Sequence, residues 1–256
     1  MRRTAEHLKE GIFVAEGEKV VRRLVESNLQ IVSMLLTEEW FAVYSDLLTS
    51  REIEDYIFVG DKSLLETIVG YGLHQGIMAI GRVPRETDVF AVAATSAKPK
   101  LFVALDGIAN SENMGVIIRN CAAFGVNVVI SGETSCDPYL RRAVRNSMGT
   151  IFRLPVTHVE DLSQSLRKLR DEFSFHIVGA DPKFVSVNVD DANLAGDVCL
   201  VLGSEGDGIS NKVRDMCTLR VKIPMWNEVD SINVSSSVAV LLFEVSRRKS
   251  CLNNRL

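Results

Sequence analysis

Short apolar runs alternate with helical patterns along the second half of this chain. Residues 101–105 form one apolar run, and residues 114–124 then place apolar side chains at helical spacing before Gly125. A second apolar run covers residues 126–130. Runs of this length are typical of buried strands, and glycine commonly follows the last turn of a helix. Residues 101–131 therefore predict a strand, a polar loop, a helix and a second strand.

The alternation continues toward the C-terminus. We predict strands at 151–156, 175–179, 198–202 and 219–223, and helices at 137–148, 160–173, 210–216 and 232–248. Strands that alternate with helices form a mostly parallel sheet with helices on both faces. The pattern therefore predicts an α/β fold for residues 101–256.

The first 95 residues show a separate, shorter pattern. It predicts helices at 16–27 and 61–68, and strands at 30–36, 56–59 and 74–80. Residues 83–100 are rich in Ala, Pro and Thr and only weakly periodic, which is typical of a linker. We therefore expect a small α/β domain at 1–95, a linker at 96–100 and a larger domain at 101–256.

Composition sets limits on the function classes. The 256 residues are 46% hydrophobic and 24% charged, as in an ordinary soluble globular protein. The net charge of −4 means that any contact with nucleic-acid phosphates must come from a local basic patch. No apolar run approaches the ~18 residues of a membrane span, and the N-terminal segment lacks the apolar core of a signal peptide. We therefore expect no membrane association and a cytoplasmic location.

The cysteines point away from metal and disulfide chemistry. There are five, an odd number, and none forms a C-x-x-C pair. This spacing disfavours both a disulfide framework and a zinc site, so we expect no bound metal. Cys121 and Cys199 fall inside predicted core elements, where cysteine usually acts as a small buried hydrophobe.

Three polar motifs lie in the loops and at the helix starts that come after predicted strands of the larger domain. The first is N-x-G-x-x-x-R at 113–119, near the carboxyl end of a central strand, where open α/β sheets bind ligands. The second is G-S-E-G-D-G at 203–208, whose spacing is neither a dinucleotide fingerprint nor a P-loop. The third is S-I-N-V-S at 231–235, which has more hydroxyl and amide side chains than a helix cap needs. Without a phosphate-binding signature, a nucleotide-dependent enzyme of another class is disfavoured.

In this order, the three motifs resemble those of the SpoU-type (TrmH-like) RNA ribose 2′-O-methyltransferases of the trefoil-knotted SPOUT superfamily. The resemblance covers the whole larger domain. The stretches V-A-E-G-E-K-V-V at 14–21 and H-Q-G-I-M-A at 74–79 are similar to the family's small substrate-binding domain. The resemblance implies a deep C-terminal trefoil knot and methyl transfer from S-adenosylmethionine to a ribose 2′-hydroxyl of structured RNA, ribosomal RNA more than transfer RNA.

The resemblance also implies site residues and a homodimer whose active site lies at the subunit interface. The implied catalytic residues are Asn113, Arg119, Glu205 and Asn233, with Arg119 approaching the partner's cofactor. The implied cofactor-binding residues are Leu202, Gly203, Gly206, Ile223, Ser231, Ile232, Asn233 and Ser235. The family assigns the base to this arginine, but a guanidinium does not readily lose a proton. A fork that clamps phosphate and stabilises a developing alkoxide is the physically easier role.

Two alternatives stay open at this point. Arg141, Arg142 and Arg145 are candidates for an RNA-backbone patch, or they form an ordinary charged helix face with ion pairs. The chain as a whole is either the methyltransferase or a catalytically silent RNA-binding protein that keeps the knotted scaffold. The intact Asn113, Arg119, Glu205 and Asn233 favour the enzyme.

Overall fold

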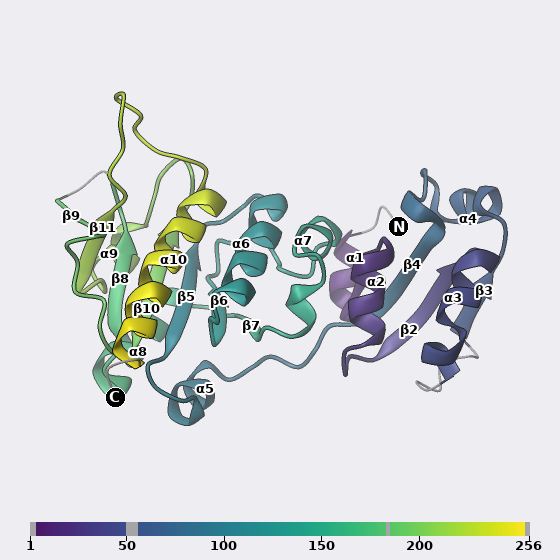
Figure 1. Ribbon diagram of the computed structural model, residues 1–256, viewed down its shortest axis with the longest axis horizontal. Coiled ribbons are helices and arrows are strands. Elements are labelled where there is room, and N and C mark those ends of the chain that lie inside the picture. The colour runs from purple at the N-terminus through teal and green to yellow at the C-terminus, as the bar shows by residue number, and fades with distance from the viewer. Residues whose placement is uncertain (1–3, 50–55, 183–184, 254–256) are drawn as a thin grey trace. The chain divides into compact units, whose positions relative to one another are not determined.

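The structure is a computed structural model and describes residues 4–49, 56–182 and 185–253. Its contacts divide the chain into two compact units (Figure 1). The first unit is Met1–Arg85 with Tyr139–Arg153, and the second is Glu86–Pro138 with Leu154–Leu256. This division differs from the predicted one because residues 139–153, expected in the larger domain, pack with the first unit.

The first unit contains a four-stranded mixed sheet. Its strands lie in the order β1 (Ile12–Glu16), β4 (Ile77–Arg82), β2 (Ile31–Leu36) and β3 (Ile57–Val59). β4 is antiparallel to both of its neighbours, whereas β3 is parallel to β2. The helices of this unit are α1 (Thr4–Glu10), α2 (Glu18–Val25), α3 (Glu38–Thr49), α4 (Lys62–Val69) and α7 (Arg141–Asn146). The apolar stripe predicted on α2 is confirmed, since Val20, Val21, Leu24 and Val25 are all buried.

The inserted segment corrects two predictions. The helix predicted at 137–148 is only Arg141–Asn146, and residues predicted to start a strand at 151 form a 3₁₀ turn, Thr150–Phe152. The strand itself, β7, is Val156–His158. The apolar residues at 151–152 are buried, but they pack in the first unit and do not form a strand. The Phe152 ring stacks on Phe13 with centroids 5.2 Å apart, and the Tyr139 ring centroid lies 5.4 Å from that of Phe13.

The second unit contains a seven-stranded sheet in which every paired neighbour is parallel. The order is β7, β6 (Val128–Ser131), β5 (Leu101–Asp106), β10 (Val198–Gly203), β8 (His176–Ala180), β11 (Leu219–Lys222) and β9 (Val187–Asn188). β5, β10 and β8 form the centre. All six residues of β5 are buried, which explains its unbroken apolar run. The predicted parallel α/β fold is confirmed.

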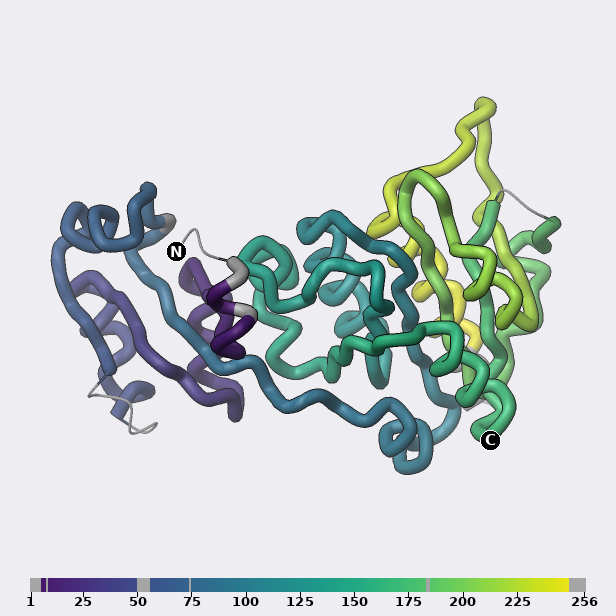
Figure 2. Tube along the Cα trace, turned by 180° about the vertical axis from the view of Figure 1, so that it is seen from behind, coloured from purple at the N-terminus to yellow at the C-terminus, as the bar shows by residue number. Residues whose placement is uncertain are grey.

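Helices cover both faces of this sheet. α5 (Val89–Thr95), α8 (Leu162–Phe173) and α9 (Asn211–Arg214) share one apolar core with alternate strand residues such as Phe102 and Val201. α6 (Ser111–Ala123) and α10 (Val234–Asn253) pack against each other on the opposite face, which Figure 1 shows from the front and Figure 2 from behind. The stretch 83–100 is therefore not a simple linker, because its middle is helix α5.

Candidate active site

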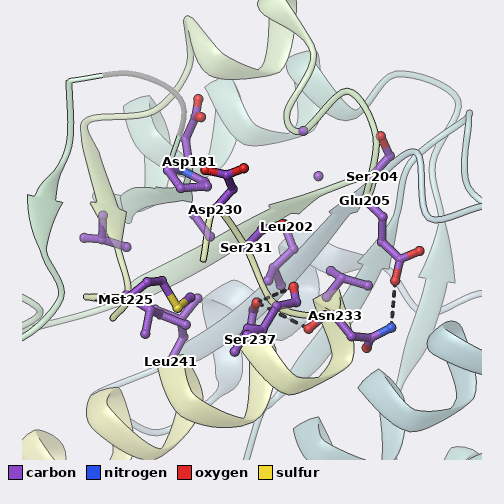
Figure 3. A pocket seen from close by; sticks show the side chains of 18 residues that line it. Asp181, Leu202, Ser204, Glu205, Met225, Asp230, Ser231, Asn233, Ser237 and Leu241 are labelled. Atoms are coloured by element: carbon purple, nitrogen blue, oxygen red, sulfur yellow. Dashed lines mark hydrogen bonds between the residues drawn. The ribbon is translucent and has the colours of Figure 1, made fainter. Parts of the chain in front are cut away.

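A cavity of about 550 Å³ opens at the carboxyl ends of the central strands (Figure 3). The strand register aligns these ends, because Gly203 lies opposite Asp106 and Leu202 lies opposite Ala180. The cavity is lined by the last residues of β8, β10 and β11, by the segments that follow these strands and by the first turns of α10: Ala180, Asp181, Pro182, Leu202, Gly203, Ser204, Glu205, Gly208, Val221, Ile223, Met225, Asp230, Ser231, Ile232, Asn233, Val234, Ser237 and Leu241. This is the edge at which parallel α/β sheets bind ligands.

The glycine motif forms a tight loop that closes on itself. Ser204 and Gly208 exchange two backbone hydrogen bonds, each 3.1 Å long. A Cβ atom on Gly203 would lie 2.1 Å from the carbonyl carbon of Gly208, so no other residue fits there without moving the backbone. A Cβ on Gly206 would meet nothing within 4 Å. Of the two glycines expected at the site, only Gly203 lines the cavity.

The three sequence motifs meet at Glu205. Its Oε1 accepts hydrogen bonds from Asn113 Nδ2 at 2.8 Å and from Asn233 Nδ2 at 2.7 Å, and Asn233 Nδ2 also lies 3.2 Å from Asn113 Oδ1. Asn110 caps α6 by accepting from the backbone amides of Glu112 and Asn113, which holds the first turn of that helix. Side chains far apart in sequence therefore form one polar cluster beside the cavity.

At the serine-rich start of α10, the Asn233 side chain caps the helix. The Asn233 side-chain oxygen accepts from the Ser235 backbone amide at 2.9 Å and from its hydroxyl at 2.5 Å. Asn120 on α6 donates to the Ser235 carbonyl at 2.9 Å and so joins the two helices. Ser235 does not line the cavity, but Leu202, Ile223, Ser231, Ile232 and Asn233 do.

Arg119 lies on α6 with its side chain exposed. Within the described residues its side chain has neither a hydrogen-bonding partner nor an ion pair, and it is not part of the cavity lining. A single copy of this chain therefore brings Asn113, Glu205 and Asn233 together but leaves Arg119 outside the cavity.

The arginines of α7 are not equivalent. Glu16 on β1 has a side chain only 2% exposed and accepts from Arg141 Nε at 2.9 Å and also from its Nη2. The Arg141 guanidinium carbon lies 4.1 Å from the centre of the Tyr71 ring, and Arg145 Nη1 is 4.0 Å from Glu16. Burial raises the pKa of Tyr71, and nearby Arg141 opposes that rise. Arg142 is exposed.

Sequence patterns did not single out Asp106, Asp181 or Arg214. The Asp106 carboxylate at the end of β5 accepts from the Ser210 amide at 2.7 Å. Asp181 lines the cavity, is 2% exposed at its side chain, and accepts from Arg214 Nε at 3.0 Å. Arg214 also donates to the Ile209 carbonyl at 2.7 Å. The available signal was position alone, because Asp106 is the last residue of β5 and Asp181 directly follows β8.

Two of the cysteines are buried, and the described residues include no cluster of potential metal ligands. Among these residues, no group of three His, Cys, Asp or Glu side chains could hold a metal ion. Cys121 and Cys199 are fully buried, which confirms the prediction for both, and burial raises the pKa of each thiol. None of the described helices has the length and hydropathy needed to cross a bilayer.

Comparison with known proteins identifies the family of this chain. The sequence model of the SpoU rRNA Methylase family matches residues 100–243, more than half of the chain. An uncharacterised tRNA/rRNA methyltransferase of Mycobacterium tuberculosis is 30% identical over 240 residues, which is 92% of this chain and 81% of that protein.

Solved structures share the fold over nearly the whole length. A TrmH-family protein of Porphyromonas gingivalis is 26% identical with a TM-score of 0.78, covering 96% of this chain and 93% of that one. The SpoU methyltransferase AviRb of Streptomyces viridochromogenes, solved with AdoMet, is 23% identical with a TM-score of 0.83, covering 97% and 94%. The family model and the methyltransferase relatives place the chain among the RNA methyltransferases. More particularly, it belongs to the SpoU rRNA methylase family.

Proposed function

We propose that this protein transfers a methyl group from S-adenosylmethionine to a ribose 2′-hydroxyl of structured RNA, ribosomal RNA more than transfer RNA. The observation that carries the proposal is the joining of Asn113, Glu205 and Asn233 by hydrogen bonds beside a cavity at the carboxyl ends of β8, β10 and β11. The three side chains come from the three family motifs. The two-unit chain and the family's name support ribosomal RNA.

The cavity suits S-adenosylmethionine in size and in chemistry. Its volume of about 550 Å³ is in the range of small-molecule sites. Apolar side chains such as Leu202, Ile223 and Leu241 suit the adenine ring. The exposed carboxylate of Asp230 suits a cofactor that carries a sulfonium and an ammonium, whereas the carboxylate of Asp181 is already paired with Arg214. Figure 3 shows these carboxylates on the side of the cavity away from Glu205.

Six of the expected residues would hold the cofactor by lining the cavity: Leu202, Gly203, Ile223, Ser231, Ile232 and Asn233. Gly206 and Ser235 would act through the loop and the helix cap that they belong to. When bound, the cofactor supplies an electrophilic methyl group on its sulfonium. The chain's own contribution is to hold the reacting hydroxyl in line with that group and to exclude water.

We place Arg119 in the partner subunit's site, within a homodimer built on the knotted fold of the family. Its exposure on α6 without a partner in the described chain supports this assignment. So does the neighbouring surface of α10, where Val240 is 42% and Phe243 is 56% exposed. Such apolar side chains are the material of a subunit interface. The guanidinium then clamps an RNA phosphate and stabilises the alkoxide as the hydroxyl loses its proton.

Subunit mixing tests the function and the shared site together. Arg119→Lys and Asn233→Ala should each abolish methyl transfer from labelled cofactor to unmodified ribosomal RNA. A point ammonium cannot copy the planar fork, and Asn233 holds the polar cluster. In a dimer of the two variants, the Arg119→Lys subunit has an intact cavity, and the Asn233→Ala subunit supplies an intact Arg119 to it. One site of the mixed dimer is therefore complete, and activity should return. Arg167→Lys, an exposed arginine on α8, is the matched control and should keep full activity.

Two results would contradict the proposal in different ways. If mixed dimers stay inactive although both variants bind cofactor, Arg119 acts within its own subunit. If calorimetry detects no binding of S-adenosylmethionine to the unaltered protein, the chain is instead a catalytically silent RNA-binding protein.

A further inference from the structure

Trp226 stands out on the surface of the second unit. It is 84% exposed, more than any other aromatic residue among those described. It belongs to the segment between β11 and α10, whose tip projects clear of the rest of the ribbon in both views (Figures 1 and 2). Its neighbours Met225 and Asp230 on either side of this tip line the cavity. The tryptophan is therefore attached directly to the wall of the active site.

The tip is a tight and strained turn. The Val229 amide donates to the Trp226 carbonyl at 3.2 Å, and both residues between them have positive φ, 56° at Asn227 and 58° at Glu228. Asparagine tolerates this region of backbone space, but glutamate does so rarely. Strain of this kind persists where the rest of the structure imposes it, and it concentrates at functional sites. The turn thus holds an aromatic ring in solvent at a conformational cost.

The chemistry of the segment favours a base over a phosphate. Residues 223–234 contain Glu228 and Asp230 and no lysine or arginine, so the segment repels an RNA backbone. An exposed indole ring offers an uncharged face on which any base can stack, and proteins commonly read RNA through unstacked bases held on aromatic side chains. A ribose that reaches the cavity brings the bases next to it close to the cavity wall.

We propose that Trp226 is a stacking platform for a base of the substrate RNA next to the nucleotide whose ribose enters the cavity. The proposal rests on the proposed function, because it takes the same cavity as the reaction site. It adds a contact with an RNA base in the second unit, whereas the contact proposed for Arg119 of the first family motif is with an RNA phosphate. Trp226 contributes to RNA affinity and not to cofactor binding.

Kinetics of the full chain test this role. Trp226→Ala should raise the KM for an unmodified ribosomal RNA transcript by about 5- to 150-fold, the range of one lost base–aromatic stack. Trp226→Phe keeps an aromatic face and should recover most of that loss. The affinity for S-adenosylmethionine should stay unchanged in both variants. Trp40→Phe, on α3 of the first unit, is the control substitution.

Fluorescence gives a direct readout, because the chain has only two tryptophans. In Trp40→Phe, all tryptophan emission comes from Trp226. The same RNA transcript should quench it, whereas heparin, a polyanion without bases, and S-adenosylmethionine alone should not.

Each contrary outcome overturns the proposal. An unchanged KM in Trp226→Ala removes the RNA contact, and equal quenching by heparin shows a charge effect without stacking. Quenching by S-adenosylmethionine alone would assign Trp226 to the cofactor site. Quenching that depends on protein concentration without RNA would assign it to contact between two copies. If the unaltered protein binds no cofactor, the proposed function fails, while quenching by RNA still decides the role of Trp226.

Discussion

At the scale of single residues, we expect opposite effects of substitution at two of the three glycines in the 203–208 loop. Gly203→Ala forces a Cβ to within 2.1 Å of the Gly208 carbonyl carbon, so the loop must open. We expect a loss of about 1–3 kcal/mol in the free energy of unfolding, typical of overpacking, and loss of cofactor binding. Gly206→Ala adds a Cβ into open space and should change neither.

Thermal unfolding with and without S-adenosylmethionine measures both effects. A Gly203→Ala protein that unfolds at the normal temperature and is still stabilised by the cofactor would show that the loop does not shape the cavity. Loss of cofactor binding in Gly206→Ala would instead show that this glycine approaches the cofactor directly, as the family resemblance first suggested.

Two neighbouring arginines of α7 are expected to behave differently. Arg141 pairs with the buried Glu16, so Arg141→Ala leaves a carboxylate without its main partner and should cost roughly 3 kcal/mol of stability. Arg142 is exposed, and we keep it as the candidate RNA contact. Arg142→Glu should weaken RNA binding and make the affinity less dependent on salt.

Filter binding of ribosomal RNA at several salt concentrations, beside thermal unfolding, separates the two roles. If Arg142→Glu binds RNA normally, the basic helix face is an ordinary charged surface. If Arg141→Ala is as stable as the unaltered protein, the pair with Glu16 does not hold this segment.

At the scale of elements, Arg214 on α9 connects two of the segments that line the cavity. It pairs with Asp181 after β8 and donates to the Ile209 carbonyl at the end of the glycine loop. Breaking such a buried pair leaves Asp181 uncompensated in the cavity wall. Arg214→Gln should therefore weaken cofactor binding by at least about tenfold, and Arg214→Lys should recover part of it.

The same helix offers a matched control for this contact. Lys212 pairs with Glu133, but its side chain is 53% exposed and Glu133 does not line the cavity. Lys212→Gln should leave cofactor affinity unchanged, since exposed ion pairs contribute little. Isothermal calorimetry with S-adenosylmethionine measures the cofactor affinity of both variants. Equal affinities in Arg214→Gln and Lys212→Gln would mean that the Arg214–Asp181 pair does not shape the cavity.

The sequence pattern predicted the bounds of strands most accurately where the strand is buried on both faces. β5 and β10 are continuous apolar runs, so they were found within one residue of their bounds. Helix α5 was missed because its sequence, VFAVAAT, is almost uniformly apolar and shows no helical stripe. The candidate site residues Asn113, Glu205 and Asn233, which the structure brings together, were predicted through the three motifs. The pairs Asp181–Arg214 and Glu16–Arg141 were not, because local patterns carry no information about which distant residues meet.

At the scale of the whole molecule, the chain passes between the two units three times, after Arg85, Pro138 and Arg153. The first unit is therefore discontinuous in sequence. Its core shows the consequence: Phe13 is 1% exposed because Tyr139 and Phe152 from the later segment pack on it. Glu16, three residues further along β1, depends on Arg141 of the same segment.

Residues 1–95 alone should therefore not form a stable domain, although the sequence pattern suggested one. Uncovering an aromatic side chain such as Phe13 costs about 1.5–3 kcal/mol, and the unpaired Glu16 adds to that loss. A small domain has only about 5–15 kcal/mol in total. A polypeptide that joins residues 1–85 to 139–153 through a Gly/Ser linker restores both contacts and should unfold cooperatively. Circular dichroism on heating compares the two, and cooperative unfolding of residues 1–95 alone would show that the inserted segment is dispensable to the first unit.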